Sequence, residues 1–217
     1  MDLTSFTPSS ALLTVVLLAL APFVAVMVTS FTKLVVVLSL LRNALGLQQV
    51  PPNVVLNGMA LVLSIYVMTP VGLEMGQRVQ GMDRIGASTQ NMLQAADAAK
   101  EPLREFLVKH SRAVEREFFL KTAQRALPPG QAAKLTDRDF LVVVPAFTVS
   151  ELAVAFEIGF LIFLPFLVID LVISNVLMAM GMMMLSPTTV SMPFKLLLFV
   201  LIDGWVKLTH GLILTYL

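Results

Sequence analysis

The feature that most constrains the fold of this 217-residue chain is a set of long segments without a charged side chain. These uncharged segments are residues 11–31, 54–73, 158–169 and 171–194. A transmembrane helix needs roughly 20 apolar residues, because a rise of 1.5 Å per residue then spans a hydrocarbon core of about 30 Å. Only 13% of all residues are charged, whereas soluble domains carry about 25%. We therefore expect an all-α membrane protein built from helical hairpins with four spans.

The charged residues are concentrated in the middle of the chain. Of the 29 charged side chains, nine acidic and eleven basic ones lie between Glu74 and Asp139. This distribution predicts three parts. An N-terminal apolar hairpin covers residues 1–73, a charged helical insert covers 74–139, and a C-terminal apolar hairpin covers 140–217.

The insert has the pattern of a helix. Residues 101–127 follow a helical period with Pro102 in the first turn, and the Pro-Pro-Gly at 128–130 ends the helix. Thr136 followed three residues later by Asp139 resembles a capping box that opens the next helix. The apolar face comprises Leu103, Phe106, Leu107, Val114, Phe118 and Leu127.

Each apolar hairpin contains predicted breaks. In the first, Pro22 should break or kink residues 11–41, and Gly46 with the proline pair at 51–52 should form the turn. Gly46, Gly58, Gly72 and Gly76 fall at helix ends or inside apolar runs, where small residues help helices to approach.

The second hairpin has a similar plan. We expect an outward arm over residues 140–185, a turn from Gly181 to Pro193 and a return arm over 194–217. The openings FTKLVVVLSLL at Phe31 and FKLLLFVLI at Phe194 are alike. A weak internal repeat of two hairpins, as in transporters built from repeats, is one hypothesis.

The sequence shows no catalytic constellation. His110 and His210 lie far apart without a metal-ligand or triad companion, so we expect packing or surface roles for them. There is no Gly-rich phosphate loop and no cysteine, so we expect no enzyme, no metal and no cofactor. A net charge of +1 indicates no nucleic-acid partner. The start carries Asp2 and no basic residue, which argues against a cleaved signal peptide and favours an N-terminus outside the cytoplasm.

Charged residues inside the C-terminal apolar part need partners, because a charge at the bilayer centre costs at least ~2.5–3.5 kcal/mol. Asp203 and Lys207 are four residues apart and can pair on one helical face. Glu157 and Asp170 have no basic residue within two turns. They must meet a charge from another segment or another chain, or face a water-filled channel, and we expect one of the first two. The charged residues assigned to such seams are Glu151, Glu157, Asp170, Lys195 and Asp203.

The stretch MAMGMMMLSP, residues 178–187, places five methionines in its first seven positions. Three hypotheses compete. Core gap-fillers should share one helical face, yet the successive Met182, Met183 and Met184 point three ways. A soft-metal path would suit Cu(I), but no Cys or His lies nearby. In a ring of identical copies the thioethers would form an apolar constriction.

Two long strings in this chain resemble a known family. They are SFTKLVVVLSLLRNALGLQQVPPNVVLNGMALVLSIYVMTP, residues 30–70, and VPAFTVSELAVAFEIGFLIFLPFLVIDLVISNVLMAMGMMMLSPTTVSMPFKLLLFVLIDGW, residues 144–205. Both closely resemble the R component of the bacterial type III secretion export apparatus, the SctR/FliP family. Without a signal peptide, the chain is more similar to the virulence-type members than to the flagellar ones.

The resemblance implies a protein that works in an assembly. Five copies would combine with the S and T components into a helical pseudo-ring in the bacterial inner membrane, with the U component attached on the cytoplasmic side. The insert would be periplasmic, the unpaired charges would lie at seams, and needle, inner-rod and effector polypeptides would pass through the ring.

The resemblance also assigns the methionine-rich turn. The family's gating methionines fall on Met182, Met183 and Met184, where an apolar constriction excludes water and flexible thioethers adapt to any polypeptide. The flanking positions are Met178, Met180, Gly181 and Pro187.

Two other classes compete with this reading. A small-molecule or ion transporter should contain a binding site formed by one chain, and the buried acids suggest this class. A passive scaffold should lack a central methionine constriction.

Overall fold

The computed structural model describes residues 8–80 and 89–217; the acidic start at Asp2 lies outside these ranges. All regular elements within the described residues are helices, which confirms the all-α expectation. They are α1 (Pro8–Met27), α2 (Phe31–Ala44), α3 (Asn53–Gln80), α4 (Thr89–His110), α5 (Ala113–Ala126), α6 (Pro129–Ala132), α7 (Phe140–Ala179), α8 (Pro187–Leu201) and α9 (Gly204–Leu214).

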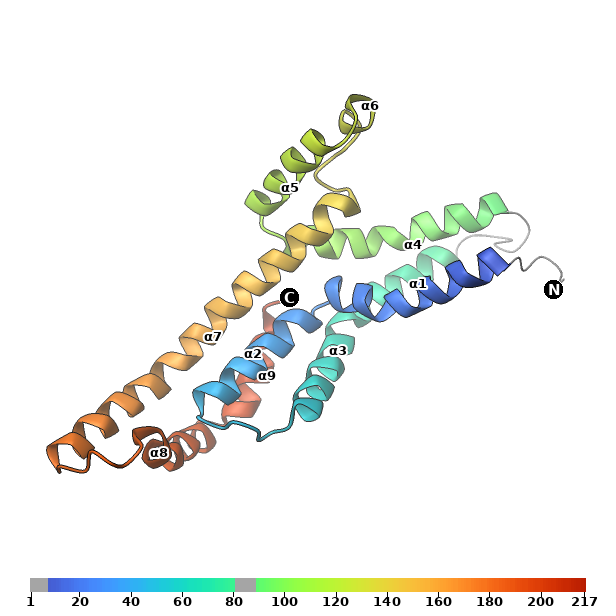
Figure 1. Cartoon of the computed structure of the whole chain (residues 1–217). Coiled ribbons are helices and arrows are strands. Elements are labelled where there is room, and N and C mark those ends of the chain that lie inside the picture. The colour runs from blue at the N-terminus through green and yellow to red at the C-terminus, as the bar shows by residue number, and fades with distance from the viewer. Residues whose placement is uncertain (1–7, 81–88) are drawn as a thin grey trace.

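The long helix α7 organises the molecule (Figure 1). Its 40 residues run without a break through Pro145 and Pro165, and at 1.5 Å per residue they extend about 60 Å. The insert helices α4 and α5 pack at one end of α7 and α6 packs against α5, whereas α8 and the methionine-rich turn lie at the other end of α7. α2, α3 and α9 lie between these two ends.

The core forms around α2. Leu34, Val37 and Leu38 are fully buried and meet Ala155 of α7 and Leu212 of α9. Two further buried clusters continue this core, one toward α8 and one toward the insert. α2 is therefore enclosed by apolar side chains, while most of the surface of the other spans stays exposed.

One glycine determines how closely α2 and α7 approach. A Cβ atom on Gly159 would lie 2.2 Å from the Leu40 Cδ1 atom and 3.1 Å from its Cβ atom. By contrast, nothing lies within 4 Å of a Cβ placed on Gly58, Gly72 or Gly76. The prediction that these three glycines bring helices together is therefore wrong within this chain, and Gly159 has that role.

The first break lies after Pro22. That proline is inside α1, and the helix ends at Met27. The axis then bends by 66° before α2. The Thr32 hydroxyl donates to the Val26 carbonyl at 2.9 Å, and the Ser30 hydroxyl donates to that of Ser64 at 3.1 Å. These side chains satisfy polar groups at the bend, so the chain turns there and not at the proline.

The return arm also breaks at an unpredicted place. α8 begins at Pro187 and includes Pro193, so the turn is shorter than predicted. The axis then bends by 62° between α8 and α9. Asp203 adopts a left-handed conformation there, with φ 52°, which aspartate tolerates better than most residues. In the first half of the chain, the bent pair α1 and α2 precedes the long helix α3. In the second half, the long helix α7 precedes the bent pair α8 and α9. The two halves are therefore not a direct repeat of hairpins.

The insert contains two main helices where one was predicted. α4 begins at Thr89, which places Pro102 in its interior, and ends at His110. The Arg116 side chain donates to the Ser111 carbonyl at 2.6 Å and so satisfies an acceptor at this break. Leu103, Phe106 and Leu107 pack in the core, but Val114 and Phe118 on α5 are exposed.

The boundaries of the insert show smaller differences. α5 ends at Ala126, so the Pro-Pro-Gly ends it as predicted. Thr136 donates its backbone N–H to the Asp139 carboxylate at 2.7 Å. The helix starts only after Asp139, so this pair closes a turn before α7 and is not a capping box. α3 crosses residue 73 and continues to Gln80, and the three-part division stays a prediction.

Two helices, α3 and α7, are long and apolar enough to cross a membrane, and the described residues contain up to four spans if each bent pair counts as one. The four predicted spans match this upper count by length and composition.

Candidate functional site

The methionine-rich turn is built on a well-formed helix end. Gly181 has φ 72°, and its N–H donates to the Met178 carbonyl at 3.0 Å. The N–H of Met182 donates to the Leu177 carbonyl at 2.9 Å. This pair of bonds is a Schellman motif, in which glycine adopts the left-handed conformation without a Cβ penalty. Pro187 then opens α8 at its first position.

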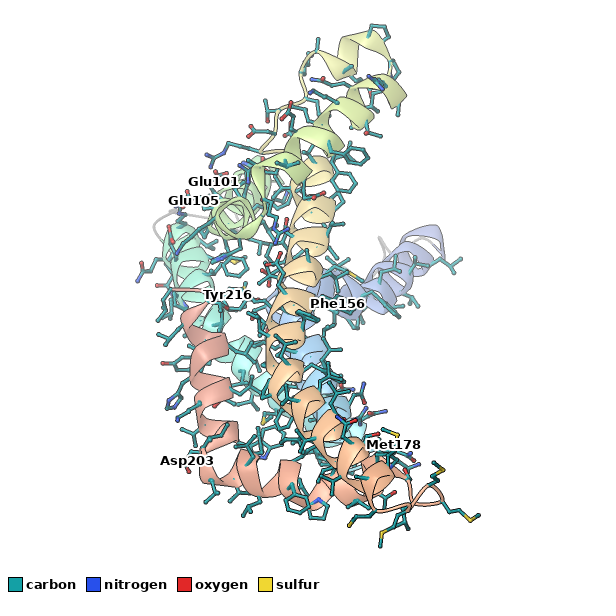
Figure 2. All side chains as sticks on the ribbon, turned by 90° about the vertical axis from the view of Figure 1, so that its left-hand side faces the viewer. Glu101, Glu105, Phe156, Met178, Asp203 and Tyr216 are labelled. Atoms are coloured by element: carbon teal, nitrogen blue, oxygen red, sulfur yellow. The ribbon has the colours of Figure 1, made fainter. Side chains whose placement is uncertain are left out.

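The methionine side chains of the turn are exposed. Met183 is 83% exposed, Met184 is completely exposed and Met182 is 46% exposed. Met178 and Met180 are also more than half exposed. Figure 2 shows the sulfur atoms near Met178 spread around the tip of the molecule. The core-packing hypothesis is therefore wrong for these residues within the chain.

The structure adds no other type of metal ligand to the methionines in support of the copper hypothesis. Among the described residues, no group of three or more His, Cys, Asp or Glu side chains is placed to hold a metal ion. The thioethers of an exposed turn would have to provide every ligand.

A buried polar cluster joins three helices in the middle of the molecule. The Lys33 ammonium of α2 lies 3.3 Å from the Glu151 Oε1 atom of α7, and both side chains are at most 3% exposed. The Tyr216 hydroxyl, just after α9, donates to the other carboxylate oxygen. The Lys33 ammonium also lies 3.5 Å from the centre of the Tyr216 ring. Glu151 therefore has its partners inside the chain.

A second ion pair joins α7 to α8. The Lys195 ammonium donates to the Asp170 carboxylate at 2.6 Å and to the Ala44 carbonyl at 3.1 Å. The Ser191 hydroxyl donates to the other oxygen of Asp170 at 2.5 Å. Asp170 and Lys195 come from different segments and meet each other next to the turn after α2.

The third pair joins α7 to the insert. The Arg112 guanidinium donates to the Glu157 carboxylate at 2.7 Å, and the Arg112 backbone N–H donates to the Ser150 hydroxyl at 2.9 Å. Unlike the other two pairs, this one is exposed. Neither Glu157 nor Asp170 needs a second chain to find a basic partner.

Asp203 behaves differently from the prediction. Among the described residues it has no ion pair, and Lys207 approaches it only by a backbone hydrogen bond of 3.0 Å to the Asp203 carbonyl. Asp203 is the residue before α9 in the left-handed conformation, so its side chain leaves the helix at another angle than an interior residue would. The predicted local pair with Lys207 is therefore wrong.

Some participants in these contacts were not found from the sequence. Lys33 is the only charge within residues 11–41, which is a usable signal. Tyr216 and Arg112 give no signal, because only the fold brings them to Glu151 and Glu157.

His110 packs at the junction of the insert and the core. Its ring lies 4.7 Å from that of Phe106 and 5.1 Å from that of Tyr216, between centres. Burial, with smaller contributions from Lys109 and Lys33, lowers the pKa of His110 to about 4. The imidazole is therefore neutral at physiological pH, as suits a packing residue.

Comparison with known proteins shows the family of the chain. The FliP family model matches residues 12–212, nearly the whole chain. The chain belongs to the FliP family. It is 54% identical to the hypersensitivity response secretion protein HrcR of Ralstonia nicotianae, over 96% of this chain and 97% of that protein.

Other relatives show which branch of the FliP family is nearer. The chain is 52% identical to the Yop proteins translocation protein R of Yersinia pestis, over 92% of both chains. It is 40% identical to the flagellar biosynthetic protein FliP of Bacillus subtilis, over 94% of this chain and 90% of that protein. These findings confirm the resemblance to the virulence-type members. The chain is thus a membrane component of the type III export apparatus and works together with other secretion components.

Proposed function

We propose that this FliP-family chain forms the gate of the export channel, and that Met182, Met183 and Met184 are its deformable seal. The observation that carries the proposal is the exposure of these side chains at the tip of a 40-residue helix. An isolated chain gains nothing from exposing three adjacent apolar residues, whereas a ring of copies would gather them around one axis.

The chemistry of methionine suits such a seal. A narrow apolar constriction excludes water and therefore ions. Three rotatable bonds and a polarizable sulfur let each side chain adapt to whichever residue passes. Gly181 and Pro187 fix the two ends of the turn, so the flanking Met178 and Met180 are held while the tip stays irregular.

The surroundings of the gate follow from the same assembly. About five copies combine with the S, T and U components into a helical pseudo-ring. Exposed apolar side chains along the outside of α7, such as Phe156, Phe160 and Leu161, are available for such contacts. Glu151, Glu157, Asp170 and Lys195 lie at seams between segments of the chain, and Asp203 is assigned to a seam with a neighbouring chain. The chain has no catalytic role and needs no cofactor.

The location follows from the resemblance to the type III export family. The assembly lies in the bacterial inner membrane, with the insert over residues 74–139 in the periplasm. The parts 1–73 and 140–217 supply the apolar hairpins. The cargo is unfolded polypeptide, namely needle, inner-rod and effector proteins.

The transporter hypothesis is less well supported. The buried acids that suggested it are occupied: Glu151 is paired with Lys33, and Asp170 with Lys195. A substrate would have to displace a buried ion pair in either place, which leaves an uncompensated charge.

The test is the ion conductance of the assembled complex in planar bilayers. Replacing all three residues 182–184 with alanine should open the constriction and cause a leak. A triple leucine variant conserves the apolar volume and should stay tight while exporting polypeptide more slowly. Met27→Ala, at an exposed methionine outside the turn, should leave the seal intact. A triple alanine complex that assembles normally and is as tight as the parent would contradict the proposal.

A further inference from the structure

An apolar groove lies between α7, α8 and α9. Its volume is about 570 Å³, within the range of roughly 300–1,000 Å³ that is typical of small-molecule sites. Its walls are almost wholly apolar and include Ile158, Ile162, Phe166, Leu198, Leu208 and Leu212. None of the contacts proposed for the gate uses this groove.

The groove has the length of one acyl chain in a membrane leaflet. Along α9 it runs from Gly204 to Thr215, and eleven residues of helix advance about 16 Å. Half of a hydrocarbon core of ~30 Å is about 15 Å. Nothing lies within 4 Å of a Cβ placed on Gly211, so the groove is open along its middle.

One end of the groove carries a positive charge. Lys207 is the only charged residue in its lining, and its exposed ammonium has no ion-pair partner among the residues that the structure describes. Trp205, two residues earlier in α9, stacks edge-on against Phe199 of the groove lining, with 5.4 Å between ring centres. Tryptophan is enriched at the headgroup level of membranes.

The position of this end in the molecule agrees with a headgroup. Figure 2 shows Asp203, the residue before α9, at the same end of the molecule as Met178, where α8 crosses below α9. The groove therefore leads from the end of the helical bundle toward its middle, as an acyl chain does below its phosphate.

We propose that this groove binds an anionic phospholipid of the surrounding membrane, with the acyl chain along α9 and the phosphate on the Lys207 ammonium. A helix of a partner subunit is the competing occupant. A protein–protein contact of ordinary size covers about 800 Å² on each side. Such a contact does not require a groove with the length of one acyl chain. The matched length and the lone cation at one end favour the lipid.

Trp205 is a built-in reporter, because it is the only tryptophan of the chain. The assembled export complex is reconstituted in phosphatidylcholine vesicles that contain increasing fractions of brominated phosphatidylglycerol or brominated phosphatidylcholine, and quenching of this chain's tryptophan is measured. Tryptophans of the partner components are replaced by phenylalanine. Half-maximal quenching should need about fivefold less of the anionic lipid, the preference that one lysine near a membrane surface provides.

Two variants separate the headgroup from the groove. Lys207→Gln should remove the preference for the anionic lipid, and Gly211→Leu should fill the groove and reduce quenching by both lipids. The matched controls are Lys134→Gln, at an exposed lysine of the insert, and Gly58→Leu, at a glycine of α3 that also faces open space. Both controls should behave like the parent.

Several outcomes would overturn the proposal. Equal quenching by the two lipids in the parent would show that Lys207 does not select an anionic headgroup. Unchanged quenching in Gly211→Leu would show that the lipid does not bind in the groove. Quenching in the separate chain that disappears in the assembled complex would show that a partner helix covers this face.

Discussion

The buried ion pair between Lys33 and Glu151 gives the sharpest prediction about stability. Both side chains are at most 3% exposed, and the ammonium and the carboxylate lie 3.3 Å apart. Lys33→Met removes the cation but retains a similar apolar volume. The Glu151 carboxylate then keeps only the hydroxyl of Tyr216 as a donor among the described side chains.

The size of the effect follows from burial. Removing one member of a buried ion pair typically costs about 3–5 kcal/mol, because the remaining charge is uncompensated. Replacing both members by apolar residues is often neutral or stabilising. The double variant Lys33→Met with Glu151→Leu should therefore recover most of the stability that Lys33→Met loses.

The assay is equilibrium unfolding of the purified chain in detergent, followed by circular dichroism. Lys121→Met is the matched control, because Lys121 forms an exposed pair with Glu117 on α5 and such pairs contribute only about 0–1 kcal/mol. The reasoning fails if Lys33→Met costs no more than this control, or if the double variant is as unstable as the single one.

Three other predictions test separate parts of the structure. The pKa of His110 is about 4 when folded and about 6.5 when unfolded. The free energy of unfolding should therefore be full above pH 6.5 and fall toward pH 4, by about 1–2 kcal/mol after allowance for its partly exposed ring. The pH-dependent unfolding of His110→Phe should lack this loss. Gly159→Ala should lower the free energy of unfolding by about 1–3 kcal/mol, because the new methyl group overpacks against α2. Gly58→Ala should raise it by about 0.5–1 kcal/mol. Thermal unfolding of both variants measures these changes. A cysteine at the exposed Gln131 should react with an impermeant thiol reagent in intact cells and one at the exposed Gln48 should not; the opposite pattern would reverse the proposed orientation.

The helical content could be predicted from the sequence, but the bends could not. Long uncharged runs require helices in a membrane, so the class follows from composition alone. Pro22, Pro145 and Pro165 all lie inside helices, while the bends fall near Ser30 and Asp203. Apolar neighbours hold a helix together across a proline, and hydrogen-bonding side chains stabilise a bend without one, so local propensity was overridden by packing.

The methionine-rich turn was located from the sequence, but its exposure was not. Gly181 gave its start, because glycine has a conformational preference that acts locally, whereas its end lies at Pro187 and not at the predicted Pro193. Whether Met183 and Met184 lie in the core depends on the path of α7, which no local pattern contains.

The partners of the buried charges depend on the fold in the same way. Asp170 and Lys195 are 25 residues apart, and Lys33 and Glu151 are 118 apart. Spacing within one helix could suggest only the pair of Asp203 with Lys207, which the left-handed residue prevents.

The central claim, that the methionine-rich turn contacts the polypeptide in transit, can be tested most directly by site-specific photo-crosslinking. A photoreactive amino acid is placed at Met183, and in a separate variant at the exposed Tyr66 of α3, in export complexes that hold a stalled secretion substrate. The account predicts a crosslink to the stalled substrate from position 183 and none from position 66. Equal crosslinking from both positions, or none from position 183 while the substrate is stalled in the complex, would contradict it.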